Sequence, residues 1–243
     1  MSVFQSAFHP EQIAVKIPIW REILLLRELI KLRSDPVFRG TGIPHGNGAA
    51  VITIPGFLCS DNYTAYLTKW LNQIGYRAFP SGIEQNNDCI ERALQRILNT
   101  IEIASAETGG KVHLIGHSLG GVLARIAATN HPEKIASIIT LGSPFRGIRA
   151  HSIILRLSDK ARSKIQSDQP HCFTGFCECP AVAALRNTLP PEVRHCAIYT
   201  KTDGIVDWNS CLGEEINHEV KGTHGGLVFN AEVYRLMAEW LHQ

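Results

Sequence analysis

Residues 112–121 carry the feature that most restricts the fold. They read Val-His-Leu-Ile-Gly-His-Ser-Leu-Gly-Gly, in which an apolar run leads directly into the pattern G-x-S-x-G around Ser118. The apolar run predicts a buried strand, and the residues from Leu119 to Ala128 predict a helix. Gly116 and Gly120 lack side chains, so the backbones of strand and helix can approach closely at a sharp turn. The segment therefore predicts a strand–turn–helix unit with the Ser118 hydroxyl exposed at the turn.

Short apolar runs alternate with amphipathic segments along most of the chain. Strands are expected at Ala49–Ile54, Tyr76–Phe79, Val112–Ile115, Ile135–Leu141, Cys196–Tyr199 and Ile216–Val220, and helices at Asn62–Ile74, Asn87–Ala106, Leu119–Ala128 and Ala231–Leu241. Such alternation is typical of a mainly parallel sheet with helices on both faces, so the predicted fold class is α/β.

Two segments lie outside this alternation. Residues 1–48 form a leader in which residues 18–33 place apolar side chains at helical spacing. Residues 147–191 interrupt the alternation after a central strand, where an insertion would lie above the carboxyl ends of the sheet and close to a bound ligand. We expect a main domain at residues 49–243, preceded by the leader and carrying residues 147–191 as a small helical cap.

A serine nucleophile requires a general base, and the base requires an acid that orients it. After a G-x-S-x-G turn of this kind, the acid and then the histidine are expected to follow the serine in the chain, each just beyond a strand end. Asp203 lies in the turn after a predicted strand and is the expected acid, with Asp207 as the alternative. His224, in the turn Gly-Thr-His-Gly-Gly, is the expected base, because His218 falls within a strand and should point into packing. His117 is expected to line the pocket or to pack.

Two backbone N–H groups are expected to stabilise the oxyanion that forms during acyl transfer. One belongs to Leu119, the residue after the nucleophile. The other belongs to Phe57, in the loop Pro-Gly-Phe that follows the first strand of the main domain. An ordinary β-turn is the alternative interpretation of this loop.

Composition limits the classes of partner. The formal net charge is only +2, which gives no reason to expect nucleic acid as a partner. Neither a secretory signal nor a long apolar span is recognised, so we expect a soluble or surface-associated, cytoplasmic protein. Residues 16–33 contain five Lys or Arg against two Glu. The leader helix is expected to pack against the main domain or in a dimer. Because of its basic surplus, peripheral contact of residues 18–33 with an anionic membrane is the alternative.

The chain has seven cysteines, an odd number that favours free thiols over a disulfide framework. Cys172, Cys177 and Cys179 are the exception, because three thiols this close could form a local disulfide or, with His171, bind zinc. Inert thiols are the first expectation, and neither a metal nor another cofactor is predicted.

With these residues assembled, the chain from about residue 49 to its end resembles the α/β-hydrolase superfamily, and within it bacterial lipases and esterases with a Gly-His-Ser-Leu-Gly-Gly turn. The shared segments are the loop 55–57, the turn at 116–121, Leu-Gly-Ser-Pro-Phe-Arg-Gly at 141–147, Thr-Asp-Gly-Ile-Val at 202–206 and Gly-Thr-His at 222–224. The resemblance implies a triad of Ser118, Asp203 and His224 and an acyl-enzyme intermediate. Phe145 stands where secreted lipases often have histidine, which argues against a secreted, metal-stabilised lipase acting on bulk fat.

The expected function is hydrolysis of carboxylic esters in lipid metabolism, with a small-molecule substrate that carries an apolar acyl group. Acyl transfer or thioester hydrolysis by the same triad is the alternative. A non-catalytic ligand-binding protein of this fold is a further alternative, but such proteins typically lose a triad residue or the turn glycines, and this sequence retains them.

Overall fold

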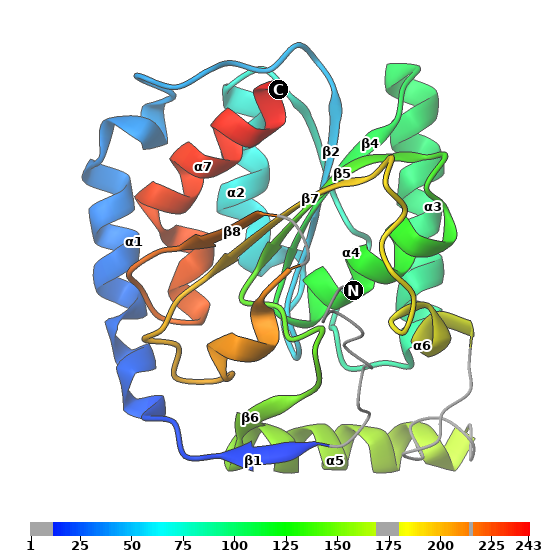
Figure 1. Ribbon diagram of the computed structural model, residues 1–243. Coiled ribbons are helices and arrows are strands. Elements are labelled where there is room, and N and C mark those ends of the chain that lie inside the picture. Colours follow the sequence, from blue (N-terminus) through cyan, green and yellow to red (C-terminus); the bar gives the residue numbers. More distant parts are fainter. Residues whose placement is uncertain (1–11, 169–179, 214–215) are drawn as a thin grey trace, which may run out of the picture.

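The computed structural model describes residues 12–168, 180–213 and 216–243. Its centre is a six-stranded sheet in the order β3-β2-β4-β5-β7-β8, and every pairing is parallel (Figure 1). The strands are β2 (Ala50–Ile54), β3 (Arg77–Pro80), β4 (Val112–His117), β5 (Ile135–Leu141), β7 (Arg194–Tyr199) and β8 (Ile216–Glu219). The predicted parallel sheet is confirmed.

Helices cover both faces of this sheet (Figure 1). One face packs against α1 (Leu25–Ser34), α2 (Asp61–Gln73) and α7 (Ala231–His242), and the other against α3 (Ile90–Thr108), α4 (Leu119–Asn130) and α6 (Pro180–Ala184). Strand β2 explains the layering: Ile52 and Ile54 join the core on the α3 and α4 side, whereas Val51 joins the other. A strand buried on both faces is apolar throughout instead of alternating.

The leader packs against the main domain. The single helix predicted there is divided into a 3-10 helix, η1 (Ile19–Leu24), and the α-helix α1. Leu32 is fully buried, and Leu25 and Leu29 pack against the same core cluster as α2 and α7. A second 3-10 helix, η2 (Pro36–Arg39), follows and is capped by the Asp35 side chain, which accepts from the Val37 N–H at 2.9 Å. The structure therefore supports the packing interpretation for one face of α1.

The insertion at 147–191 contains a strand that periodicity did not predict. Strand β6 (Arg149–His151) pairs in parallel with β1 (Ile13–Val15) of the leader, and α5 (Ser152–Asp168) follows. These three elements lie together across one end of the main sheet (Figure 1). Strands of three residues are too short for a periodic signal. The predicted cluster of Cys172, Cys177 and Cys179 lies outside the described residues.

None of the helices described is both long enough and apolar enough to cross a membrane.

The turn between β4 and α4 combines close packing with backbone strain. Ser118 has φ 52° and ψ −121°, and in the described part of the chain it is one of only two non-glycine residues with positive φ. A Cβ atom on Gly116 would lie 2.4 Å from backbone atoms of Gly120 and Gly121. Because backbone cannot move aside as a flexible side chain can, only glycine fits at position 116.

We predict that Gly116→Ala destabilises the protein by on the order of 1–3 kcal/mol, because the added methyl group overlaps the backbone of α4. Gly110→Ala is the matched control, since a Cβ there has no neighbour within 4 Å. Thermal denaturation of both variants provides the measurement. Equal melting temperatures for the two variants would contradict the packing argument.

Candidate active site

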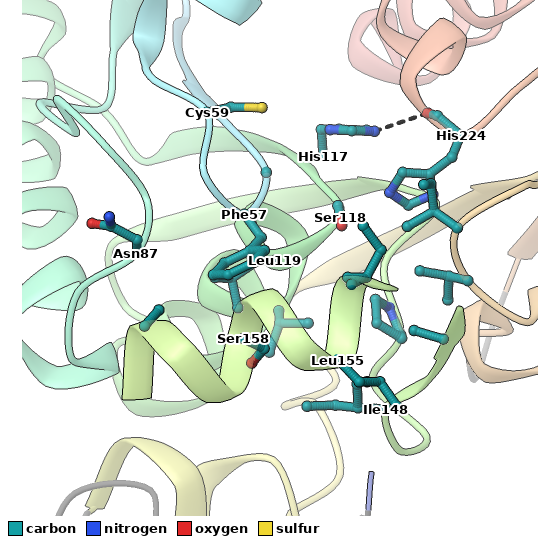
Figure 2. Close-up of a pocket in the computed structure, with 18 of the residues that line it drawn as sticks. Phe57, Cys59, Asn87, His117, Ser118, Leu119, Ile148, Leu155, Ser158 and His224 are labelled. Carbon is teal, nitrogen blue, oxygen red and sulfur yellow. Dashed lines mark hydrogen bonds between the residues drawn. The ribbon is translucent and has the colours of Figure 1, made fainter. Parts of the chain in front are cut away.

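Ser118 connects β4, which lies between β2 and β5 in the sheet, to the largely buried helix α4. Its N–H donates to the carbonyl of Leu141 at the end of β5, at 2.8 Å, and its carbonyl accepts from the N–H of Gly121 at 3.0 Å. These hydrogen bonds hold the serine backbone between two neighbouring elements. The side chain faces a pocket of about 390 Å³ (Figure 2).

The structure brings the predicted acid and base together. Asp203 follows β7, and His224 lies directly before the 3-10 helix η4 (Gly225–Phe229). The distance between His224 Nδ1 and Asp203 Oδ2 is 2.7 Å, and both residues are at least 95% buried. Asp203 Oδ1 accepts from the N–H groups of Ile205 and Val206 at 2.8 and 2.7 Å. One carboxylate oxygen is therefore held by the backbone while the other faces the imidazole.

The charge on Asp203 sets the protonation of His224. Burial alone would lower the pKa of His224, because it disfavours the charged imidazolium. The charge of Asp203 and its hydrogen bond outweigh burial, and Glu22 adds to them, so the pKa of His224 lies above its ordinary value. With His224 neutral, Nδ1 donates to Asp203 and Nε2 carries the free lone pair.

The alternative acid and base lie elsewhere. Asp207 forms an ion pair with Arg149 at 2.9 Å and caps the 3-10 helix η3 (Trp208–Cys211) by accepting from the Asn209 N–H at 3.1 Å. His218 lies on the edge strand β8, half-buried, and is not among the residues that line the pocket. Neither residue belongs to the Asp203–His224 pair.

The two expected oxyanion donors flank Ser118. Phe57 and Leu119 both line the pocket, and Figure 2 shows them beside Ser118. Among the described residues, neither of their N–H groups donates to a protein acceptor. A Cβ on Gly56 would lie 2.9 Å from His117 Nδ1 and 3.1 Å from the Ser118 Cβ, so this glycine brings the loop close to the serine. The geometry is compatible with the predicted oxyanion hole.

The rest of the pocket is mainly apolar. Helix α5 of the insertion runs along the side opposite the serine and contributes Leu155 and Ser158 (Figure 2). Apolar side chains come from the insertion, α4 and the loop after β2, and include Phe57, Leu119, Val122, Ile148, Ile154 and Leu155. Such a pocket suits a hydrocarbon chain.

Three further residues at the site are His117, Tyr63 and Glu22. The sequence carries no signal for Tyr63 or Glu22, and for His117 only its position next to Ser118. His117 is buried, and because a carbonyl can only accept, its Nε2–H donates to the His224 carbonyl at 2.9 Å. Burial lowers the pKa of His117 to about 3, so its ring is neutral. Tyr63 donates its hydroxyl to the Gly225 carbonyl at 2.7 Å. Glu22 of the leader also lines the pocket.

Within the described ranges, no three His, Cys, Asp or Glu side chains are grouped so that they could hold a metal ion.

Comparison with known sequences shows partial relatives. A triacylglycerol lipase of Pseudarthrobacter phenanthrenivorans is 31% identical over 106 residues, which cover 40% of this chain and 33% of that protein. A triacylglycerol lipase of Burkholderia plantarii is 31% identical over 106 residues, which cover 40% of this chain and 30% of that protein. The chain therefore spans about a third of the length of these relatives.

Solved structures support the fold over a larger part of the chain. One of two metagenome-derived lipolytic enzymes, LipS and LipT, matches with a TM-score of 0.59 and 14% identity over 82% of this chain and 96% of that one. A soluble variant of a monoglyceride lipase from Saccharomyces cerevisiae matches with a TM-score of 0.55 and 14% identity, covering 82% and 89%. These likenesses confirm the predicted α/β-hydrolase fold.

Residues 77–208, more than half of the chain, match the family model described as the PGAP1-like alpha/beta domain. This range includes the turn at Ser118, the insertion and Asp203. The chain therefore belongs to the PGAP1-like alpha/beta domain family of α/β-hydrolase proteins.

Proposed function

We propose that this protein hydrolyses carboxylic esters, with Ser118 as nucleophile, His224 as general base and Asp203 as the acid that orients the base. The observation that carries the proposal is the buried Asp203–His224 pair, 2.7 Å apart, in a pocket that Ser118 also lines. Since Nδ1 of His224 donates to Asp203, Nε2 is the atom that accepts the serine proton. The partial relatives named triacylglycerol lipases support the same activity.

The reaction proceeds in two halves. His224 Nε2 takes the Ser118 proton as the serine oxygen attacks the ester carbonyl carbon, and the oxyanion accepts hydrogen bonds from the N–H groups of Phe57 and Leu119. When this intermediate collapses, His224 returns the proton to the leaving alcohol and an acyl-serine remains. A water molecule, deprotonated by His224, then attacks the acyl-serine, and His224 returns that proton to the Ser118 oxygen as the carboxylic acid leaves.

The substrate is proposed to be a small ester with an apolar acyl group. The pocket wall opposite Ser118 is built from aliphatic side chains of the insertion, including Ile148, Ile154 and Leu155. Each methylene group that such a wall removes from water contributes up to about 0.8 kcal/mol to binding. Substrates with longer acyl chains are therefore expected to bind more favourably, up to the length that the pocket accommodates.

Residues 18–33 are further proposed to contact an anionic membrane. The face of η1 and α1 that does not pack against the main domain exposes large apolar side chains: Trp20 (64% exposed), Ile23 (80%), Leu24 (45%), Leu26 (62%) and Ile30 (61%). An amphipathic helix of this kind can lie at a membrane interface with its apolar side chains inserted.

Basic residues border this apolar face. Arg21, Arg27 and Lys31, together with Lys221 of the neighbouring loop, line a surface groove of about 770 Å³. Each cation near an anionic leaflet contributes about 1 kcal/mol of attraction. Because apolar and basic side chains lie on one surface, the proposed partner is a bilayer that contains anionic lipid.

Ser118→Ala is expected to abolish hydrolysis of p-nitrophenyl butyrate and octanoate, because it removes the attacking oxygen. For the wild type, kcat/KM should be about tenfold or more higher for octanoate, since four additional methylene groups reach the apolar wall. Steady-state kinetics measure both effects, and fluorophosphonate labelling reports the reactivity of Ser118. Ser105→Ala on α3 is the control. A folded wild type that neither hydrolyses esters nor reacts with the fluorophosphonate would refute the proposal, and faster transfer to an added alcohol than to water would indicate an acyltransferase.

Asp203→Asn is expected to lower kcat by on the order of 10⁴-fold, because the imidazole loses the partner that sets its tautomer. In the wild type, kcat/KM should fall as the pH drops through the raised pKa of His224, where the base becomes protonated. Loss of the Asp203 charge lowers this pKa, so the acidic limb of the profile should move to lower pH. Asp207→Asn is the matched control, and a larger effect of that control on kcat would show that the acid is misassigned.

Ile23→Ser is expected to weaken binding to vesicles of phosphatidylglycerol and phosphatidylcholine, because Ile23 is the most exposed apolar residue of the proposed contact face. Ile103→Ser on α3 removes an isoleucine that is 56% exposed and lies outside this face, so it should leave binding unchanged. Vesicle co-sedimentation measures the difference. Equal binding by the two variants would argue against contact with an anionic membrane. So would wild-type binding to pure phosphatidylcholine vesicles that equals its binding to the mixed vesicles.

A further inference from the structure

The carboxylate of Glu22 joins two loops that lie far from it in sequence. Its Oε1 accepts from the N–H of Gly204 at 2.9 Å and from the N–H of His224 at 3.0 Å, and its Oε2 accepts from the N–H of Gly225 at 2.9 Å. Gly204 directly follows Asp203, so one side chain holds the backbone beside both members of the acid–base pair. Hydrogen bonds from N–H groups to a carboxylate are stronger than those between neutral groups.

A second leader carboxylate extends this contact. Glu28 accepts from the N–H and the hydroxyl of Thr223, at 2.8 and 3.2 Å. A Cβ on Gly226 would lie only 1.2 Å from Glu28 Oε2, and one on Gly204 would lie 2.8 Å from Glu22 Oε1. The glycines in these two loops therefore leave the space that the leader carboxylates occupy.

The carbonyl side of the histidine loop is held from the opposite direction. His117 Nε2–H donates to the His224 carbonyl at 2.9 Å, and the Tyr63 hydroxyl donates to the Gly225 carbonyl at 2.7 Å. Residue 224 thus has its N–H bound by the leader and its carbonyl bound from β4. With both backbone groups engaged, the loop has little freedom to move relative to Ser118.

We propose that Glu22 is a positioning residue, which holds the His224 loop and the Asp203 turn in the arrangement that proton transfer from Ser118 requires. The inference rests on the proposed function, and it assigns to the leader a part in the active site. A displacement of about 1 Å of a catalytic group can lower a rate by on the order of 10²-fold. Loss of the Glu22 contacts is therefore expected to lower kcat more than it changes KM.

The negative charge of Glu22 also acts on the base. It raises the pKa of His224 together with Asp203, whereas His117 beside it is neutral. Glu28, on the other side of Thr223, has its pKa raised to about 7 by burial, and the charge of Lys31 acts against this rise. Tyr63 contacts the loop through the Gly225 carbonyl, and Cys59 lines the same pocket. Removing the charge of Glu22 should lower the pKa of His224.

The test compares Glu22→Gln with Glu22→Asp. The glutamine keeps the length but replaces one acceptor oxygen with a donor and removes the charge. We expect kcat to fall by on the order of 10- to 100-fold with KM changed less than about twofold, and the acidic limb of kcat/KM to move to lower pH. Aspartate keeps the charge but is one methylene shorter, so kcat should fall while the acidic limb stays nearer its wild-type position.

Glu239→Gln, on the exposed side of α7, is the control, and thermal denaturation monitors folding of all variants. Folded Glu22→Gln and Glu22→Asp proteins with wild-type kcat and an unmoved pH limb would overturn the proposal, as would changes of equal size in Glu239→Gln. If Glu22→Gln does not fold, Glu22→Asp alone decides through its kcat. The rate of fluorophosphonate labelling at Ser118 reports on the base without any ester substrate, so failure of the proposed function and failure of the positioning proposal are distinguishable.

Discussion

At Ser118 the end of β4 meets the first turn of α4 so closely that a Cβ on Gly116 would lie 2.4 Å from backbone of Gly120. Strand β4 is bonded to β2 on one side and β5 on the other, so this contact lies at the centre of the sheet. Close packing and the backbone hydrogen bonds to Leu141 and Gly121 hold the serine in its strained conformation. The rest of the site is arranged around Ser118, the proposed nucleophile, whose position the core determines.

Asp203 and His224, the proposed acid and base, have a different kind of support. Both lie beyond the ends of strands near the edge of the sheet, in loops with little regular structure of their own. Hydrogen bonds with distant side chains replace the missing secondary structure. Glu22 of the leader accepts from loop N–H groups, whereas Tyr63 of α2 and His117 of β4 donate to loop carbonyls. Buried loops need such partners, because an unpaired backbone N–H or carbonyl removed from water costs free energy.

The leader presents two chemically different surfaces. Toward the main domain it presents Glu22, Glu28 and the buried side of α1, and toward solvent it presents Trp20, Ile23 and basic residues. Helical periodicity predicted the apolar positions, but it could not assign them to a face, because α1 has apolar residues on more than one side. Only the contacts of α1 with η4 and η2 show which of these residues are buried.

The sequence by itself determined the elements whose signals are local. The bounds of β5 were predicted as Ile135–Leu141, and the turns at Ser118, Asp203 and His224 were recognised, because apolar runs and glycines act over a few residues. Only the tertiary structure placed Asp203 within 2.7 Å of His224 and the carboxylate of Glu22 on both loops. It also paired β1 with β6 across more than a hundred residues. These contacts depend on packing between distant segments, which leaves no periodic pattern in the chain.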